Sequence, residues 1–348
     1  MNVKIILTML AGLLAQPALA QGFAGMGSSA DGFASPSRDT RFSFPLDHAA
    51  HPDFRIEWWY VTANLTGEDG KSYGIQWTLF RSALAPHTQD NWQDPQIWMG
   101  HAAVTSEDVH LTAERFARGG IGQAGVEAQP FAAWIDDWQM AGADINAVSL
   151  SAQGTDFAYR LELTADGPLV PQGDQGYSVK SASGQASYYY SQPFYQVRGQ
   201  LDLPGGSVNV HGNAWLDREW SSQPLAENQS GWDWISLTLE GGTKLMGFRL
   251  RQSDGSDFSS GTWINANGIP SPLAPGELQM TPLRRTQVFE RDIPVDWQVE
   301  LPNYGVDVTL KALNDNAWMD MAFPYWEGPV TITGSHEGVG YLEMTGYE

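Results

Sequence analysis

A short acidic segment holds side chains suited to acid–base chemistry. Asp217 and Glu219 flank Arg218 directly before Trp220. The three charged residues either face a substrate together or form a structural clamp in which the arginine holds both carboxylates. If the protein is an enzyme, Asp217 and Glu219 are candidate proton donors, and Arg218 and Trp220 are candidate ligand contacts.

A second acidic residue lies between two indoles. Asp233 separates Trp232 from Trp234. In an extended segment neighbouring side chains point to opposite faces, so the carboxylate and the two indoles are expected on different sides. Trp232 and Trp234 are candidate ligand contacts. Asp233 is a third candidate acid, with a surface position or a contact between domains as the alternatives.

The segment Glu57-Trp58-Trp59-Tyr60 combines an acid with three aromatic residues. Burial beside Trp58 would raise the pKa of Glu57 and make it a possible acid. Alternation predicts that Trp59 faces away from Trp58 and Tyr60, so one face should be core and the other can line a pocket. All four residues are candidate ligand contacts, with a purely core role as the alternative. His101, on another alternating segment, is a further candidate, with an ordinary core or surface histidine as the alternative.

Other chemistries lack the residues that they need. The chain has no cysteine, which excludes thiol catalysis, disulfides and cysteine–metal sites. His48 and His51 lie near Asp47 and Asp53, but a metal site needs three or four convergent ligands, so neither metal nor cofactor is predicted. The sequence contains no Gly-x-Ser-x-Gly nucleophile motif and no complete Gly-x-x-x-x-Gly-Lys-Ser/Thr phosphate-binding loop.

The net charge and the first twenty residues limit where the protein can be located and what it can bind. A net charge of −21 and the lack of a basic run argue against nucleic-acid binding. Lys4, the apolar stretch 5–14 and the small-x-small site ending at Ala20 are typical of a signal peptide cleaved after Ala20. No later segment is long and apolar enough to span a membrane. We therefore expect a periplasmic or secreted protein.

The elements that would position these residues are predicted to be strands. Turn signals such as Asp69-Gly70 and Asn267-Gly268 separate alternating segments such as 159–163 and 306–310. Aromatic residues and glycine are abundant, with 15 Trp and 37 Gly, as in proteins built from short strands and tight turns. The one expected helix covers 107–118. The fold class predicted is all-β, either sandwich or barrel.

A weak internal repeat predicts two related halves. Residues 59–67 lead through Lys71 and Gly74 to Leu79-Phe80-Arg81, and residues 234–241 lead through Lys244 to Gly247-Phe248-Arg249. The polar stretch 221–231 suits the join. The expected organisation is a signal peptide over 1–20, a flexible lead-in over 21–43, a first barrel over 44–225 and a second over 226–348.

Three tryptophan-rich stretches occur in an order that resembles the AttH and carotenoid hydratase (CrtC, hydroxyneurosporene synthase) family: 55–60, 217–221 and 231–234. The resemblance runs from about Phe44 to the C-terminus and includes 100–105. It implies two tandem lipocalin-like antiparallel β-barrels packed together, with an apolar pocket in or between them.

The family resemblance implies two functions of different kinds. Some members resemble accessory components of an envelope ABC transport system, which makes an apolar or amphiphilic ligand (lipid, isoprenoid or polyene) and an ABC permease the expected partners. The hydratases add water to an isoprenoid double bond, for which a carboxylic acid must protonate the alkene and aromatic faces must stabilise the cation. The hydratase turn carries histidine where this chain has Arg218, which cannot exchange a proton near neutrality. A protein-interaction module is the third alternative.

Overall fold

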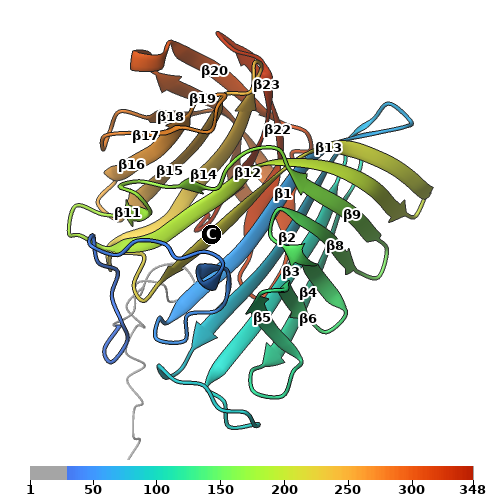
Figure 1. Cartoon of the computed structure of the whole chain (residues 1–348). Coiled ribbons are helices and arrows are strands. Elements are labelled where there is room, and N and C mark those ends of the chain that lie inside the picture. The colour runs from blue at the N-terminus through green and yellow to red at the C-terminus, as the bar shows by residue number, and fades with distance from the viewer. Residues whose placement is uncertain (1–29, 348) are drawn as a thin grey trace, which may run out of the picture.

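The computed structural model describes residues 30–347, and over this range the protein is built from strands, with 3₁₀ turns at Leu46–His48 and Pro302–Tyr304. The predicted signal peptide and the start of the predicted lead-in lie outside the described residues. Two antiparallel sheets make up the molecule (Figure 1). Among residues 30–347 no helix is long and apolar enough to cross a membrane. The all-β prediction is confirmed.

The first sheet has 13 strands. They are β1 (Ile56–Gly67), β2 (Ser72–Ala83), β3 (Gln96–Thr105), β4 (His110–Arg118), β5 (Ala124–Ala128), β6 (Phe131–Ile135), β7 (Trp138–Asp144), β8 (Ala147–Gln153), β9 (Ala158–Ala165), β10 (Val170–Pro171), β11 (Tyr177–Val179), β12 (Ala186–Leu203) and β13 (Gly206–Ser221). Its main path runs β4-β3-β2-β1-β13-β12-β9-β8-β7-β6-β5, so β1 pairs with the much later β13.

The second sheet has 10 strands. They are β14 (Gln229–Leu239), β15 (Lys244–Gln252), β16 (Asp257–Ile264), β17 (Pro270–Pro272), β18 (Gln279–Val288), β19 (Arg291–Leu301), β20 (Val306–Ala312), β21 (Trp318–Met319), β22 (Tyr325–Gly334) and β23 (Gly338–Met344). The chain passes from the first sheet to the second between Ser221 and Gln229.

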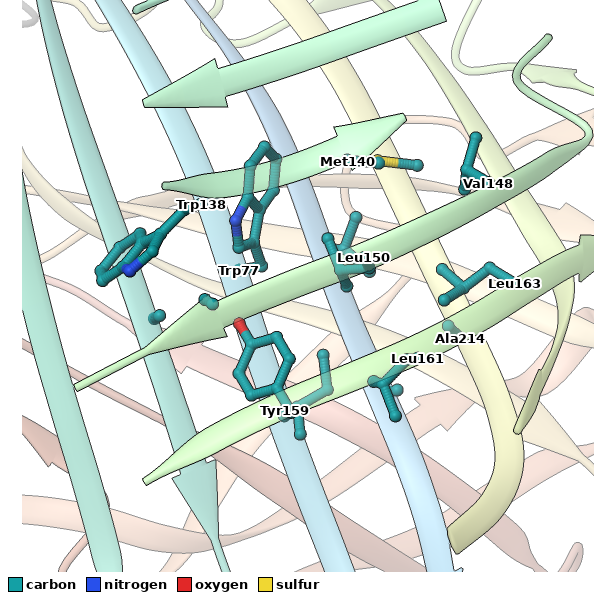
Figure 2. Packing of buried hydrophobic residues seen from close by; sticks show 14 of the residues in the cluster. Trp77, Trp138, Met140, Val148, Leu150, Tyr159, Leu161, Leu163 and Ala214 are labelled. Atoms are coloured by element: carbon teal, nitrogen blue, oxygen red, sulfur yellow. The ribbon is translucent and has the colours of Figure 1, made fainter. Parts of the chain in front are cut away.

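Each sheet curls around its own hydrophobic core. In the first sheet, Trp138 of β7 and Tyr159 of β9 lie over Trp77 of β2 (Figure 2), and all three are almost fully buried. Alternation explains this packing, because every second residue of β8 and β9 points inward. The core of the second sheet is separate and is centred on Trp297 and Trp326.

The helix expected over 107–118 does not form. Residues His110–Arg118 are strand β4, which pairs with β3 from Thr105 opposite His110 to Ile97 opposite Arg118. The alanine, glutamate and arginine residues of this segment favour a helix, but the propensity difference between residues is only tenths of a kcal/mol each. Pairing satisfies the backbone groups of β3 and β4 along their shared edge and overrides that preference.

The described part of the lead-in packs against the first sheet. The backbone N–H of Ser37 donates to the hydroxyl of Tyr188 at 2.8 Å, and the ring of Phe42 lies 5.4 Å from that of Trp220. Phe42 thereby covers aromatic side chains that the sheet would otherwise expose.

The two Trp-headed hairpins of the repeat have equivalent cross-strand pairs. In β1 and β2, Trp58 lies opposite Phe80 and Glu57 opposite Arg81. In β14 and β15, Trp234 lies opposite Phe248 and Asp233 opposite Arg249. The counterpart of Trp234 is therefore Trp58 rather than Trp59.

Candidate functional site

A cavity of about 410 Å³ lies between the two sheets. Its walls come from β1, β2, β3, β4, β12 and β13 of the first sheet and from β14, β15, β22 and β23 of the second. The segment between the sheets and the loops that carry Lys180 and Phe323 complete them. Most of the surface is apolar. The apolar and aromatic wall residues are Ile56, Trp58, Tyr60, Phe80, Ile97, Met99, Phe116, Tyr189, Pro224, Leu225, Trp232, Trp234, Phe248, Leu250, Phe323 and Tyr325.

Strand alternation decides which side chains reach the cavity. On β1, Trp58 and Tyr60 line it, whereas Trp59 between them is fully buried in the core of the first sheet. On β13, Asp217 and Glu219 line it and the intervening Arg218 does not. The same alternation on β14 brings both Trp232 and Trp234 to the cavity and turns Asp233 away.

Asp217 is a buried carboxyl group surrounded by neutral hydrogen-bond donors. Tyr189 Oη donates to its Oδ2 at 2.5 Å, and Ser191 Oγ and Trp215 Nε1 donate to its Oδ1 at 2.5 and 2.6 Å. Burial raises the pKa of Asp217 to about 7, and the three hydrogen bonds lower it only in part. This carboxyl group is therefore able to give up or take a proton near neutral pH.

Two further acids of the second sheet lie at the same interface. Glu343 of β23 lines the cavity and accepts a 2.6 Å hydrogen bond from Trp232 Nε1. Burial raises the pKa of Glu343 to about 7, and the nearby charges of Asp217 and Glu219 act in the same direction. Glu327 of β22 accepts a hydrogen bond from the hydroxyl of Tyr60, and burial raises its pKa well above the ordinary value.

Glu219 differs from these acids because it has a cationic partner. The ammonium group of Lys180 lies 2.9 Å from its Oε1. The same ammonium lies 4.8 Å from the ring centroid of Tyr189 and 4.3 Å from that of Phe248. The cavity wall thus holds one ammonium group between two aromatic rings and a carboxylate.

His101 connects the cavity with the surface. Its Nδ1 lies 2.9 Å from the hydroxyl of Tyr325, and its Nε2 lies 3.2 Å from Oε1 of the partly exposed Glu114. Burial lowers the pKa of His101, although the neighbouring Glu114 raises it. The histidine is therefore part of a hydrogen-bonded contact between the two sheets.

On the face of β1 and β13 that points away from the cavity, a buried carboxylate has charged partners, unlike Asp217 with its neutral hydrogen-bond donors. Glu57 forms ion pairs with Arg81 and Arg218, and Nδ1 of His51 lies 3.2 Å from its Oε2. Burial would raise the pKa of Glu57, but the two guanidinium groups hold it well below its usual range. The ring of His51 stacks on Trp220 at 4.1 Å. Glu57 stays ionised, which is the behaviour of the structural clamp.

Asp233 belongs to a similar clamp in the second sheet. It forms ion pairs with Arg249 and Arg251 and accepts a 2.9 Å hydrogen bond from Tyr347 Oη. Burial nevertheless raises its pKa, because the loss of solvation outweighs the arginines. Its carboxylate does not reach the cavity.

Eight of the twelve predicted site residues contribute to the cavity wall: Glu57, Trp58, Tyr60, His101, Asp217, Glu219, Trp232 and Trp234. Of these, Glu57 only borders the cavity, because its carboxylate points to the opposite face and pairs with Arg218 there. Four do not, because alternation turns them to the opposite face: Trp59, Arg218, Trp220 and Asp233. Sequence reasoning missed Lys180, Phe248 and Glu343. Strand alternation predicts that Glu343 lies on one of the two faces of its strand. Only the pairing of Trp234 with Glu343 shows which of these faces meets the cavity.

The fold and the cavity define a two-barrel, lipocalin-like protein with a largely apolar cavity between its barrels. The AttH-like family model matches residues 35–347. The chain belongs to the AttH-like family, and the resemblance inferred from the three tryptophan-rich stretches is confirmed.

Two solved structures share this architecture. A protein assigned as AttH from Nitrosomonas europaea is 33% identical, covers 91% of this chain and 100% of its own, and superposes with a TM-score of 0.82. Kievitone hydratase from Nectria haematococca is 14% identical, covers 91% of this chain and 98% of its own, and has a TM-score of 0.67. No curated protein matches the chain. The predicted fold class, two tandem lipocalin-like antiparallel barrels, is confirmed.

Proposed function

We propose that the protein binds an apolar or amphiphilic small molecule in the cavity between its barrels. The observation that carries this proposal is the cavity of about 410 Å³, whose walls are mostly aromatic and aliphatic. Small-molecule sites typically have this size and composition, with a few polar groups to orient the ligand. In this proposal the protein is exported, with its leader removed after Ala20, and serves an envelope ABC transport system as a ligand-binding accessory.

Native mass spectrometry of protein purified from cells that export it tests for the ligand. We expect a stoichiometric apolar molecule that solvent extraction releases unchanged. The mass of the protein would also show whether the chain begins at Gln21.

A fluorescent apolar probe, N-phenyl-1-naphthylamine, tests the cavity directly. The variant Met99→Trp fills the space from β3 and should abolish probe binding. The control Leu283→Trp places the same indole on an exposed part of β18 outside the cavity and should bind as the wild type does. Equal binding by both variants would mean that the probe sits elsewhere.

A second candidate function, hydration of an isoprenoid double bond, is supported by one observation. Asp217 places a carboxyl group with a pKa of about 7 in the cavity beside Trp234 and Tyr189. In this reaction the carboxylic acid protonates one alkene carbon and aromatic rings stabilise the tertiary cation. Water then attacks the cation and returns a proton to the Asp217 carboxylate, so the acid is restored.

The replacement of histidine by Arg218 bears on this alternative in a specific way. Arg218 is fully buried on the opposite face from Asp217 and pairs with Glu57. The difference from the hydratase turn therefore falls outside the cavity. If the protein is a hydratase, Asp217→Asn should abolish turnover of an isoprenoid alkene, whereas in a carrier it should leave affinity for a neutral ligand nearly unchanged.

A further inference from the structure

Some charged side chains of the cavity wall have an oppositely charged partner, and two acids do not. Glu219 is paired with Lys180, and Glu57 is paired with Arg81 and Arg218. Asp217 and Glu343 remain, and within residues 30–347 neither forms an ion pair. All the hydrogen bonds described above for these two acids come from neutral hydroxyl and indole groups.

The two acids lie close enough to affect each other. The charge of Asp217 raises the pKa of Glu343, and burial has the same effect on both. The cost of ionising them in this apolar space would fall if a cation stood between them. Within residues 30–347, the lysine and arginine side chains of the wall do not do so, because Lys180 is already paired with Glu219 and Arg81 with Glu57.

The aromatic residues beside these acids suit an organic cation. Trp232 and Trp234 flank Glu343 on the neighbouring strand, and Trp58 of β1 lines the same cavity. Indole faces attract ammonium groups most strongly among aromatic side chains. Lys180, held over Tyr189 and Phe248, is an example of such a contact in the same wall.

The rest of the cavity is suited to an apolar tail. Ile97, Phe116 and Phe323 line it and are also substantially exposed, so they form its open, apolar rim. A ligand with one charged end and one apolar end would place the tail along this rim and the head beside the acids.

We propose that the cavity selects amphiphiles with a cationic ammonium head, which Asp217, Glu343 and the surrounding indoles receive. This inference rests on the proposed function, since it names the ligand class of the same cavity. The strongly acidic chain, with a net charge of −21, would also favour the approach of a cation over that of an anion.

Three probes with the same ten-carbon tail test the inference: decyltrimethylammonium, decanol and decanoate, each below its micelle-forming concentration at pH 8. Displacement of N-phenyl-1-naphthylamine gives the three affinities. We expect the cation to bind about tenfold more tightly than the alcohol, and the anion to bind most weakly. An alcohol that binds as tightly as the cation would overturn the inference and leave the proposed function standing. If neither the naphthylamine nor any of the three probes binds, both fail.

Amide variants locate the selectivity. Asp217→Asn and Glu343→Gln should each reduce the preference for the cation over decanol about fivefold, because each removes one ion–ion attraction to the ammonium head, with decanol affinity unchanged. Unchanged decanol affinity also shows that the variants are folded. The control Glu240→Gln removes the same charge at an exposed turn of the second sheet and should keep the preference. A preference lost equally in all three variants would indicate attraction by net charge alone and would overturn the assignment to these acids.

Calorimetry at pH 7 in two buffers with different ionisation enthalpies provides a test without variants. The titratable and charged groups that face the two acids are Tyr189, Glu219, Lys180, Tyr60 and Glu327. A cation beside the two half-protonated acids should release protons on binding, and decanol should release none. Equal proton exchange for both ligands would contradict the inference.

Discussion

Glu57 and Asp217 are two buried carboxyl groups on adjoining strands, and their pKa values are shifted in opposite directions from the ordinary values. Glu57, on β1, lies between Arg81 and Arg218, which hold its pKa well below the usual range. Asp217, on β13, accepts hydrogen bonds from neutral groups only, and burial raises its pKa to about 7. Burial acts on both in the same direction, so the guanidinium groups make the difference.

The comparison separates an acid held in an ion-pair network from one that faces the cavity without a cationic partner. A carboxylate held by two arginines stays charged and ties the segment just before β1 to β1 and β13 through His51 and Arg218. A carboxyl group that faces a cavity without a cation is available for a ligand or a proton. The two faces of one strand pair therefore carry different tasks.

The largest effect is expected from breaking the ionic network. Arg218→Met leaves Glu57 with one guanidinium and removes the stack of Arg218 on Trp59, whose ring centroid lies 3.9 Å away. Removing one partner of a buried ion pair typically costs about 3–5 kcal/mol of the free energy of unfolding. Urea denaturation at pH 7 measures this loss. Binding of N-phenyl-1-naphthylamine per folded molecule should not change, and a loss below about 1 kcal/mol would show that the network is dispensable.

The second-largest effect is expected in the pH dependence of the free energy of unfolding, and it comes from Asp217. Because its pKa is raised in the folded state, the folded protein binds this proton more tightly than the unfolded chain does. The stabilisation that the Asp217 proton gives the folded state is therefore complete below about pH 4 and is lost as the pH rises to about 7 and beyond. A shift from 3.8 to about 7 corresponds to at most about 4 kcal/mol.

Asp217→Asn tests this dependence, since the amide does not titrate. The free energy of unfolding of the wild type, minus that of the variant, should fall by up to about 4 kcal/mol between pH 4 and pH 8. Glu240→Gln should show no comparable change, because its carboxylate is exposed. A difference that rises with pH would mean that Asp217 behaves as Glu57 does.

The smallest effect is expected from an exposed ion pair. Arg160 and Asp202 lie 3.5 Å apart on the surface of the first sheet, where solvent screens their attraction. Arg160→Met should change the free energy of unfolding by less than about 0.5 kcal/mol in the same urea experiment. This variant makes the same substitution as Arg218→Met, so the contrast measures burial rather than loss of an arginine. Equal losses of the free energy of unfolding in the two variants would mean that burial does not change how much these ion pairs contribute.

Strand periodicity made much of this molecule predictable, and its failures have local causes. Alternation predicted that Trp59 would face away from Trp58 and Tyr60, and that Asp233 would face away from its tryptophans, and both do. The expected helix over 107–118 failed because backbone pairing with β3 outweighs small differences in helix propensity. The clamp considered for Asp217, Arg218 and Glu219 does not form, because Arg218 pairs instead with Glu57 of the neighbouring strand.

The sequence alone determined the all-β class, the family and the residue types that suit a cavity, because side-chain period and aromatic motifs are properties of the local chain. Only the tertiary structure decided which acid meets which cation. Glu57 and Arg218 are far apart along the chain, and so are Trp232 and Glu343, and strand pairing brings each pair together. The pKa of a buried acid depends on those neighbours, so the roles of Glu57 and Asp217 follow from the register of β1 and β13.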